Sequence, residues 1–182
     1  GQGVRGRIAG RDVALGNRLG RHALCVHAPT CGDALALEHN GDLYSCDHYV
    51  EPGYRLGNLA TATLAEMVGS PRQRAFGQAK QSALPAYCRQ CDVLELCHGG
   101  CPKDRFIATP DGEPGLNYLC EGYRLFFRHL GTSLDYMADE LRAARPPASV
   151  MDLMARLDAD LAKNVARAGR NDPCPCGSGR KV

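Results

Sequence analysis

Residues 88–101 read CRQCDVLELCHGGC, and Pro102 follows them. The four cysteines are spaced Cys-x2-Cys-x5-Cys-x3-Cys, which puts four sulfur atoms within fourteen residues. Two thiols separated by two residues can bind one metal while the N–H groups of the loop point at the sulfurs. The ten cysteines of the chain could also form a disulfide framework. The close spacing is more typical of metal binding, so we expect loops that a metal organises.

Four more cysteines extend this pattern, and they divide unevenly along the chain. Three lie upstream and one lies downstream, so the eight thiols fall into groups of three and five. A cubane cluster or a tetrahedral ion takes four ligands. In bacterial ferredoxins the last Cys of the run, which precedes a Pro, ligates the other cluster. Cys101 precedes Pro102 and is therefore the crossover candidate.

This crossover divides the thiols into two predicted ligand sets. The first set is Cys25, Cys31, Cys46 and Cys101. The second set is Cys88, Cys91, Cys97 and Cys120. Zinc and iron–sulfur clusters both accept four thiolates, so the spacing leaves the choice between them open.

Length and composition limit the classes of protein. The 182 residues suffice for one domain with a small appendix. Without its cysteines the apolar core is modest, and such a core usually needs metal or disulfides. The net charge of +2 gives no indication of a nucleic acid or membrane partner. We see no signal peptide, and we interpret the start at Gly1, in a Gly/Arg-rich stretch, as a cut end.

Apolar periodicity and turn residues predict an α+β fold. Residues 1–24 contain the end of a helix. Asn40-Gly41 lies between two short alternating runs and predicts a β-hairpin in which both turn residues have positive φ. Residues 85–120 are dominated by loops. The expected fold is a small cysteine-rich domain with a β-hairpin and cluster-binding loops, followed by helices.

The helices are predicted from apolar spacing and from Pro and Gly. The predicted helices cover residues 58–68, 71–81, 121–145 with a break at Gly131, and 150–168. Pro146-Pro147 is interpreted as a linker. On the second of these helices, Arg72, Arg74 and Lys80 are interpreted as a solvated face.

The stretch from Cys25 to Cys120 resembles the SPASM domain of radical S-adenosylmethionine enzymes, and more closely the anaerobic sulfatase-maturing enzymes. Besides the eight cysteines, the matching segments are CG at 31–32, LEHNGDLYSCDH at 37–48, VEP at 50–52 and LGN at 56–58. The resemblance implies two 4Fe–4S clusters that are fully ligated by protein, with the crossover proposed above. It also implies that residues 1–24 end a missing partial barrel, that residues 25–130 form the twin-cluster domain and that residues 131–168 form C-terminal helices.

The resemblance implies the reaction as well. Enzymes of this family oxidise a Cys or Ser side chain of a sulfatase to Cα-formylglycine. A 5′-deoxyadenosyl radical takes a hydrogen from the substrate Cβ, a base removes a proton, and an auxiliary cluster accepts an electron. The implied base is Asp47, because it directly follows Cys46; the alternative is an ordinary Asp at the end of a hairpin.

The partners and location follow from the same resemblance. They are a sulfatase polypeptide as substrate, and a low-potential electron donor such as flavodoxin or ferredoxin. The expected location is the bacterial cytoplasm.

One motif of these enzymes is absent from the sequence. The cluster that binds S-adenosylmethionine is held by Cys-x3-Cys-x2-Cys, whereas after Cys97 and Cys101 the third position is Asp104. We therefore expect S-adenosylmethionine and a third 4Fe–4S cluster in a missing N-terminal domain, and no activity from this chain alone.

The last residues, 169–182, differ in character from the rest. Residues 169–181 read GRNDPCPCGSGRK and resemble the SEC-C motif, a small zinc module. Cys174 and Cys176 supply two ligands, whereas a tetrahedral zinc site needs a second pair. We expect an unstructured tail or weakly bound zinc, with a role in docking.

Two other functions stay open at this point. One is a SPASM enzyme that modifies a different peptide. The other is a zinc-stabilised adaptor whose cysteine loops and tail only bind partners.

Overall fold

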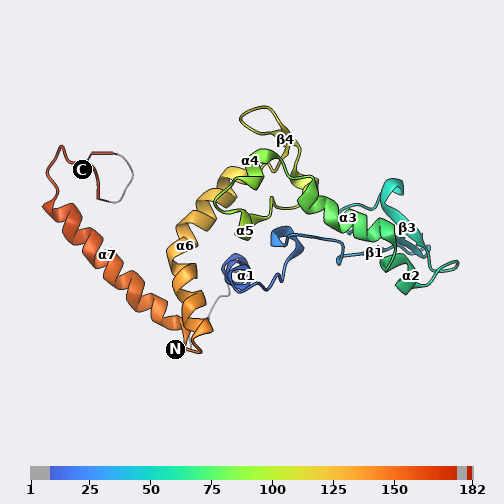
Figure 1. Ribbon diagram of the computed structural model, residues 1–182, viewed down its shortest axis with the longest axis horizontal. Coiled ribbons are helices and arrows are strands. Elements are labelled where there is room, and N and C mark those ends of the chain that lie inside the picture. Colours follow the sequence, from blue (N-terminus) through green and yellow to red (C-terminus); the bar gives the residue numbers. More distant parts are fainter. Residues whose placement is uncertain (1–8, 176–179, 182) are drawn as a thin grey trace. The chain divides into compact units, whose positions relative to one another are not determined.

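The computed structural model describes residues 9–175, 180 and 181 of the chain (Figure 1). It divides into two compact units, Gly1–Leu130 and Gly131–Val182. Helix α6 (Cys120–Arg142) begins in the first unit and ends in the second. Helices and small antiparallel sheets occur together, which confirms the predicted α+β class.

The predicted hairpin is present, and a third strand joins it. The strands are β1 (Ala36–Leu37), β2 (Asp42–Tyr44) and β3 (Arg55–Asn58), all antiparallel in this order, with the short helix η2 (Pro52–Tyr54) before β3. Leu37 faces Leu43, and the Glu38 N–H donates to the Asp42 carbonyl at 2.9 Å, so the turn consists of the three residues 39–41. Of these three, only Gly41 has positive φ, at +86°. Our two-residue turn was wrong, because a type I turn followed by a glycine bulge closes this hairpin.

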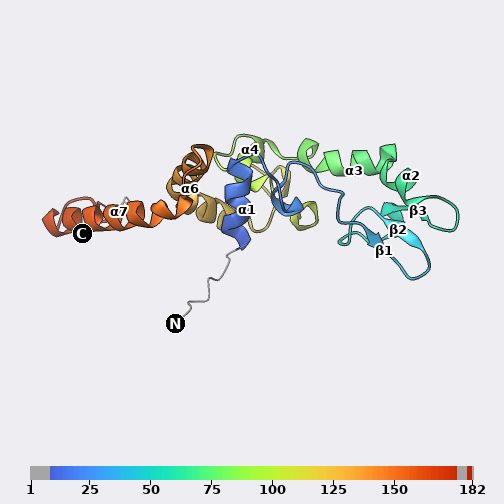
Figure 2. The ribbon, with the colours of Figure 1, turned by 90° about the horizontal axis from the view of Figure 1, so that it is seen from below.

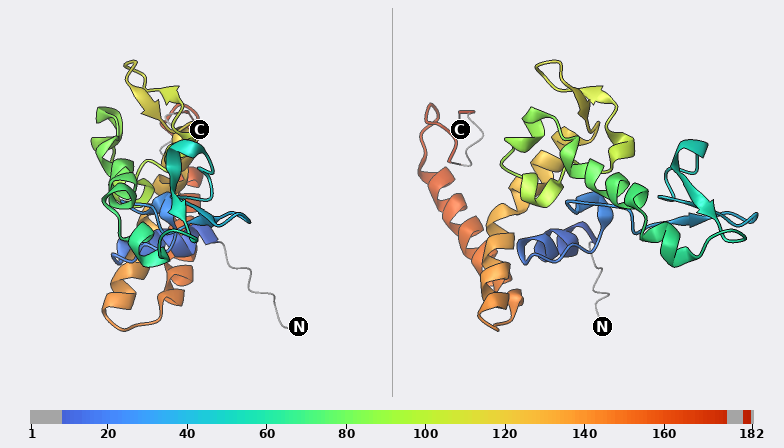
Figure 3. Two further views of the ribbon diagram at one scale, coloured as in Figure 1. Left: turned by 90° about the vertical axis from the view of Figure 1, so that its right-hand side faces the viewer. Right: turned by 45° about the vertical axis from the view of Figure 1, so that its right-hand side comes forward.

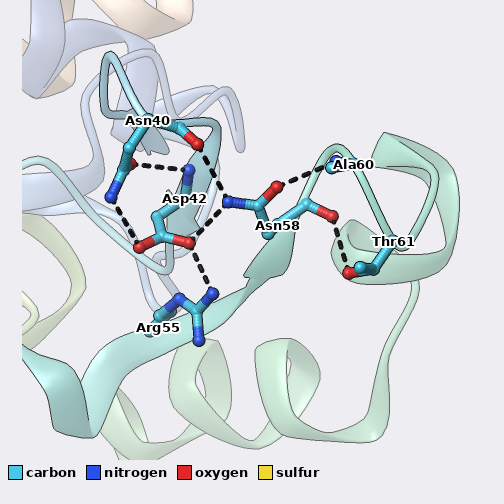
Figure 4. A network of polar contacts seen from close by, with 6 residues as sticks. All are labelled: Asn40, Asp42, Arg55, Asn58, Ala60 and Thr61. Atoms are coloured by element: carbon cyan, nitrogen blue, oxygen red, sulfur yellow. Dashed lines mark hydrogen bonds and ion pairs between the residues drawn. The ribbon is translucent and has the colours of Figure 1, made fainter.

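Side chains around the hairpin turn hold the third strand (Figure 4). Asn58 Nδ2 donates to the Asn40 carbonyl at 3.0 Å and to Asp42 Oδ1 at 2.8 Å. Arg55 forms an ion pair with the same Asp42 carboxylate at 2.5 Å. The network fixes the ends of β2 and β3, and β2 leads directly to Cys46.

The helix predicted over residues 58–68 is much shorter. Asn58 ends β3, and its Oδ1 accepts from the Ala60 N–H at 2.8 Å, which stabilises a turn. Helix α2 (Leu64–Val68) begins only after Thr63, which forms a capping box with Glu66. Our prediction treated apolar spacing as sufficient and missed these local side-chain bonds.

Helix α3 (Pro71–Ser82) connects the sheet to the cysteine loops in the views of Figures 1 and 2. It begins where we expected, because the Ser70 hydroxyl caps the N–H of Gln73 and Pro71 suits the first helical turn.

The cysteine loops contain several short elements. These are α4 (Ala86–Arg89), α5 (Leu94–Cys97), η3 (Pro102–Asp104), β4 (Ile107–Ala108) and β5 (Pro114–Leu116). Strands β4 and β5 form the hairpin that projects from these loops in Figure 3. An apolar cluster of this region centres on Leu84, Cys88 and Leu116. The helices and strands here are only two to four residues long, which fits the prediction of loops that depend on metal.

The expected helix within the first 24 residues is α1 (Ala9–Arg18). It lies against α5 and against the short helix η1 (Cys25–His27). Buried Asn17 joins the three elements, because its Nδ2 donates to the carbonyls of His27 at 2.6 Å and of Leu96 at 3.2 Å.

The second unit is a pair of helices. It contains the rest of α6, the short helix η4 (Pro147–Ser149) and α7 (Val150–Arg167). Our predicted break at Gly131 was wrong: α6 continues through it, and a Cβ there would have no neighbour within 4 Å. No helix in the described part of the chain combines the length and apolar character of a membrane span.

Candidate metal centres

The four cysteines of the second predicted set surround one small cavity. Cys88 lies on α4, Cys91 in the turn after it, Cys97 at the end of α5 and Cys120 at the start of α6. The cavity is otherwise lined mainly by apolar side chains such as Leu94 and Leu116. We call these four residues the second thiol group.

Two glycines make this cavity possible. Gly99 and Gly100 follow α5 with φ of +71° and +64°. A Cβ on Gly99 would lie 2.3 Å from Leu84 Cδ2, and one on Gly100 would lie 2.4 Å from Asn117 Nδ2. Neither site admits a side chain without moving its neighbours, so the loop between Cys97 and Cys101 depends on glycine.

The electrostatics of the second thiol group favour a bound cation. Burial raises the pKa of Cys97 to about 11, and charge on Cys120, Cys88 and Cys91 contributes to this shift. The pKa values of Cys88 and Cys120 are also raised, chiefly by burial. Thiolates so close together need positive charge, and four thiols around one apolar cavity fit an iron–sulfur cluster.

The structure also brings the first predicted set together. Cys25 lies on η1, Cys31 precedes the sheet, Cys46 follows β2 and Cys101 precedes η3. Burial raises the pKa of Cys31, and charges on Cys25 and Cys101 act on it in the same direction. Burial also raises the pKa of Cys46 to about 11, with Cys101 among the smaller causes. We call these four residues the first thiol group.

Cys101 therefore lies near Cys31 and Cys46, the thiols with which the crossover groups it. Its sequence neighbour Cys97 lines the cavity of the second thiol group, whereas Cys101 does not. The second predicted set thus lines one cavity, and members of the first set lie near enough for their charges to act on one another. Their roles as cluster ligands remain a prediction.

Backbone contact with α3 positions Cys31. The Cys31 N–H donates to the Gly77 carbonyl at 3.3 Å. A Cβ on Gly77 would lie only 2.3 Å from the Cys31 carbonyl oxygen. Buried Gln73 on the same helix donates to the carbonyls of Gly32 at 2.7 Å and Ser45 at 3.0 Å. Helix α3 thus holds the segments before Cys46 and after Cys31.

Asp47, the predicted base, is exposed beside the first thiol group. Its N–H donates to the Ala34 carbonyl at 2.8 Å, which fixes its backbone at the edge of the hairpin. The Cys46 thiol donates to Asp47 Oδ1 at 3.2 Å, and this bond lowers the pKa of Asp47. A cysteine that ligates metal has lost that proton, so the bond belongs to the thiol form.

His48 lies next to the same sulfurs. Its Nδ1 is 3.5 Å from the sulfur of Cys101, and donor atoms of Cys46, Asp47 and His48 all lie within 4.8 Å of one another. The imidazole is therefore placed to donate a hydrogen bond to a sulfur of the first thiol group.

Our interpretation of Lys80 as a solvated residue was wrong. Its exposed fraction is 1%, and its Nζ donates to the carbonyls of Cys25, Val26 and Ala28. Its helix neighbours Arg72 and Arg74 are exposed, as expected. The sequence carries no local sign of this burial, because the three carbonyls precede Lys80 by more than fifty residues.

Our sequence analysis did not single out two further polar residues near the thiols, Arg105 and Asn117. Arg105 is partly buried and donates only to backbone carbonyls, those of Lys80, His98, Gly99 and Gly100. Asn117 is buried, and its Nδ2 lies 3.4 Å from the carbonyls of Gly99 and Cys101.

The SEC-C-like tail folds back on itself in its described part. Pro173 pairs with Lys181, and the Cys174 N–H donates to the Arg180 carbonyl at 2.7 Å. This pairing differs from the unstructured tail that we predicted. Cys176 lies outside the described residues, so zinc binding there stays a prediction.

Comparison with known families agrees with this geometry. Residues 25–92 match SPASM, described as an iron–sulfur cluster-binding domain, and residues 170–181 match the SEC-C motif. The chain therefore carries a SPASM iron–sulfur cluster-binding domain and a SEC-C motif.

The relatives make the assignment more specific. The chain is 49% identical over 141 residues to the serine-type anaerobic sulfatase-maturating enzyme of Bacteroides thetaiotaomicron, covering 77% of this chain and 34% of that protein. It is 30% identical over 124 residues to the cysteine-type enzyme of Clostridium perfringens, covering 68% and 33%. The SPASM domain described here is thus that of a protein related to the anaerobic sulfatase-maturating enzymes.

Solved structures give the same result. The structure titled "Native anSMEcpe with bound AdoMet" matches with a TM-score of 0.60 and 30% identity, over 71% of this chain and 35% of that one. A second, whose title adds a Cp18Cys peptide, matches equally well over 72% and 36%. The chain spans about a third of the length of these relatives.

Proposed function

We propose that this chain is the auxiliary-cluster part of a radical S-adenosylmethionine oxidoreductase that converts a Cys or Ser of a sulfatase polypeptide to Cα-formylglycine. The observation that carries the proposal is the gathering of eight thiols into two groups of four. When bound there, two 4Fe–4S clusters would supply acceptance of single electrons. The cysteines would hold them, and the buried loops would exclude water from the sulfurs.

Asp47 is the residue that we propose as the base. Oxidation of the target side chain releases a proton from its hydroxyl or thiol, and a carboxylate oxygen of Asp47 would accept it. Asp47 is exposed, so a peptide can reach it, while its backbone is fixed by the bond to Ala34.

The rest of the proposed enzyme lies outside these residues. The sequence has no Cys-x3-Cys-x2-Cys, so we assign S-adenosylmethionine and a third cluster to other parts of the polypeptide. A flavodoxin or ferredoxin would supply electrons to that cluster, and the bacterial cytoplasm would be the site of the reaction. Identity of 49% to a serine-type and 30% to a cysteine-type relative favours Ser as the target.

Anaerobic reconstitution with iron and sulfide tests the cluster assignment. We expect about eight irons per chain and the broad visible absorption of thiolate-ligated clusters, because each group of four thiols accepts one 4Fe–4S cluster. A colourless protein with two bound zinc ions would refute the redox function and support the zinc-stabilised adaptor.

Substitution of Asp47 tests the proposed base in the complete enzyme. Asp47→Asn removes the proton acceptor, so formylglycine formation on a Ser-containing sulfatase peptide should fall by roughly 10²–10⁴-fold. Mass spectrometry of the peptide measures the product. Iron content and absorption should stay as in the unchanged protein.

Glu51→Gln is the matched control, because Glu51 is an exposed carboxylate near the same hairpin. It should retain full turnover. Equal turnover of the two variants would remove Asp47 from the chemistry.

A further inference from the structure

Two cationic side chains, those of Lys80 and Arg105, line one cavity together with Cys31. Lys80 lies on α3, and Arg105 directly follows η3. The ammonium of Lys80 uses its three donors on the carbonyls of the η1 segment. The guanidinium of Arg105 donates to the Lys80 carbonyl at 2.7 Å and the Gly99 carbonyl at 3.0 Å. Both cations are thus fixed by neutral partners.

Within the described part of the chain, neither cation has a carboxylate partner. Among the ion pairs of the described residues, none includes Lys80 or Arg105. Burial of an unpaired charge is unfavourable, so a folded protein rarely keeps one without compensation. Carbonyl dipoles offset part of this cost. The acidic groups whose charges act on both cations include thiols.

The two cations differ in which thiols they face. Burial lowers the pKa of Lys80 to about 8, and thiolate charge on Cys31, Cys25 and Cys101 opposes this. These three belong to the first thiol group. Burial also lowers the pKa of Arg105, and the charges that oppose it come from both groups: Cys88, Cys97, Cys101 and Cys31. The contacts agree with this division, because Lys80 donates to the carbonyl of Cys25 in the first thiol group. Arg105 donates to the carbonyls of His98 and Gly100, which lie between Cys97 of the second group and Cys101 of the first.

A cation held in a fixed position changes the reduction potential of a negatively charged cluster beside it. Four thiolates outweigh the positive charge of an iron–sulfur core, and reduction adds one more negative charge. A nearby cation stabilises the reduced form more than the oxidised form, which raises the reduction potential. The effect is large where water is excluded, as it is around the 1%-exposed Lys80.

We propose that Lys80 and Arg105 set the reduction potentials of the clusters: Lys80 raises that of the first thiol group, and Arg105 raises both. They act as positioning residues through charge, and they do not ligate iron. This inference rests on the proposed function, because it requires a cluster at each group. It gives the first site two stabilising cations and the second site one, so the first cluster is made the better electron acceptor.

Redox titration of the complete, anaerobically reconstituted polypeptide, followed by electron paramagnetic resonance, tests the proposal. In Lys80→Gln the amide still donates to carbonyls but the charge is lost. At a fixed potential its first cluster should show a roughly tenfold lower ratio of reduced to oxidised form, about 59 mV for one electron. Its second cluster should be unchanged. Arg105→Gln should shift both clusters.

Control variants separate charge from structure. A Cys46→Ala protein, which keeps only the second cluster, assigns the two signals. Arg72→Gln is the matched control, because Arg72 is an exposed cation on α3 that also donates to a carbonyl, that of Gly53. It should shift neither potential. Lys80→Arg and Arg105→Lys keep the charge and should restore the original values.

Each outcome decides the question. Loaded Lys80→Gln and Arg105→Gln proteins with unchanged potentials would overturn the inference and leave the proposed function intact. If Lys80→Gln failed to take up iron while Lys80→Arg did so, the result would support the inference that the positive charge stabilises the cluster. If both variants failed to take up iron, only the shape of the side chain would matter, and the result would count against the inference. An unchanged protein that binds zinc instead of iron would refute the proposed function itself.

Discussion

At the scale of single residues, the cysteine loops are held by side chains that donate to backbone carbonyls. Gln73, Lys80 and Asn117 are all buried, and each donates to carbonyls near a cysteine. Loop carbonyls have no strand partner, so such bonds satisfy groups that would otherwise be buried unpaired. The positions of the sulfurs thus depend on polar residues that are far away in sequence.

Gly77 gives a prediction at this scale. In Gly77→Ala the new Cβ would meet the Cys31 carbonyl at 2.3 Å, so α3 and the Cys31 segment must separate. We expect a loss of about 1–3 kcal/mol in the free energy of unfolding and reduced iron uptake by the first thiol group. Denaturant unfolding and iron analysis measure the two effects.

Gly122→Ala provides the comparison. Gly122 lies within α6, and a Cβ there has open space. Alanine in a helix should add roughly 0.5–1 kcal/mol of stability. If both variants behaved alike, the close contact at Cys31 would not matter.

The grouping of the thiols could be predicted from the sequence, whereas the burial of Lys80 could not. Ligand spacing is local, and the count of four per site leads to the crossover of Cys101. The burial of Lys80 depends on carbonyls up to 55 residues earlier in the chain, which no local pattern reports. Residues whose role depends on distant backbone are therefore the ones that sequence reasoning missed.

At the scale of elements, side-chain bonds to the backbone decide where helices and turns begin. Thr63 and Glu66 form the cap that starts α2, so the preceding residues stay in β3 and its turn. Asn40 accepts from the Asp42 N–H at 3.0 Å, which favours the three-residue turn of the hairpin. Apolar periodicity predicted α3 and α7 well because these helices have strong caps or long apolar patterns. It failed at residues 58–63 and at Gly131.

The junction between α6 and α7 gives a pH prediction. Glu140 accepts two bonds from Arg145, at 2.6 and 3.0 Å, and these bonds lower the pKa of Glu140; a weaker bond from Ser149 adds to them. A lowered pKa in the folded state means that the stabilisation is full above the unfolded pKa, which is 4.5 for Glu. It is lost as the pH falls through the lower, folded pKa.

Hydrogen exchange of the α6–α7 amides, compared at each pH with Glu140→Gln, measures this effect. The unchanged chain should be better protected above pH 4.5, and the difference should disappear in stronger acid. Asp139→Asn is the control, since the exposed Asp139 pairs with Arg142 and should change protection little. A difference that persisted in acid would exclude the Glu140 carboxylate as its source.

At the scale of the whole molecule, the predicted crossover of Cys101 would join the two thiol groups. Cys101 leaves the run that supplies the second group and joins residues from the N-terminal side of the sheet. The SPASM match over residues 25–92 covers the first three members of one group and only two of the other. Spacing and resemblance predicted this arrangement, while the short elements between the cysteines became clear only in the structure.

Double substitutions test the crossover by iron count. Cys46→Ala with Cys101→Ala should leave about four irons per chain, because both residues serve one cluster. Cys97→Ala with Cys101→Ala should leave almost none, because one ligand is lost from each site. The opposite pair of results would place Cys101 in the second group.

The crossover also fixes an order of events while the chain is being made. A ribosome releases residues from the N-terminus onward, so Cys25, Cys31 and Cys46 emerge long before their fourth partner. By the time Cys101 appears, three cysteines of the other group are already present. With the predicted ligand sets, neither site would close early, and the nascent chain would carry open thiols until almost the entire domain had been synthesised.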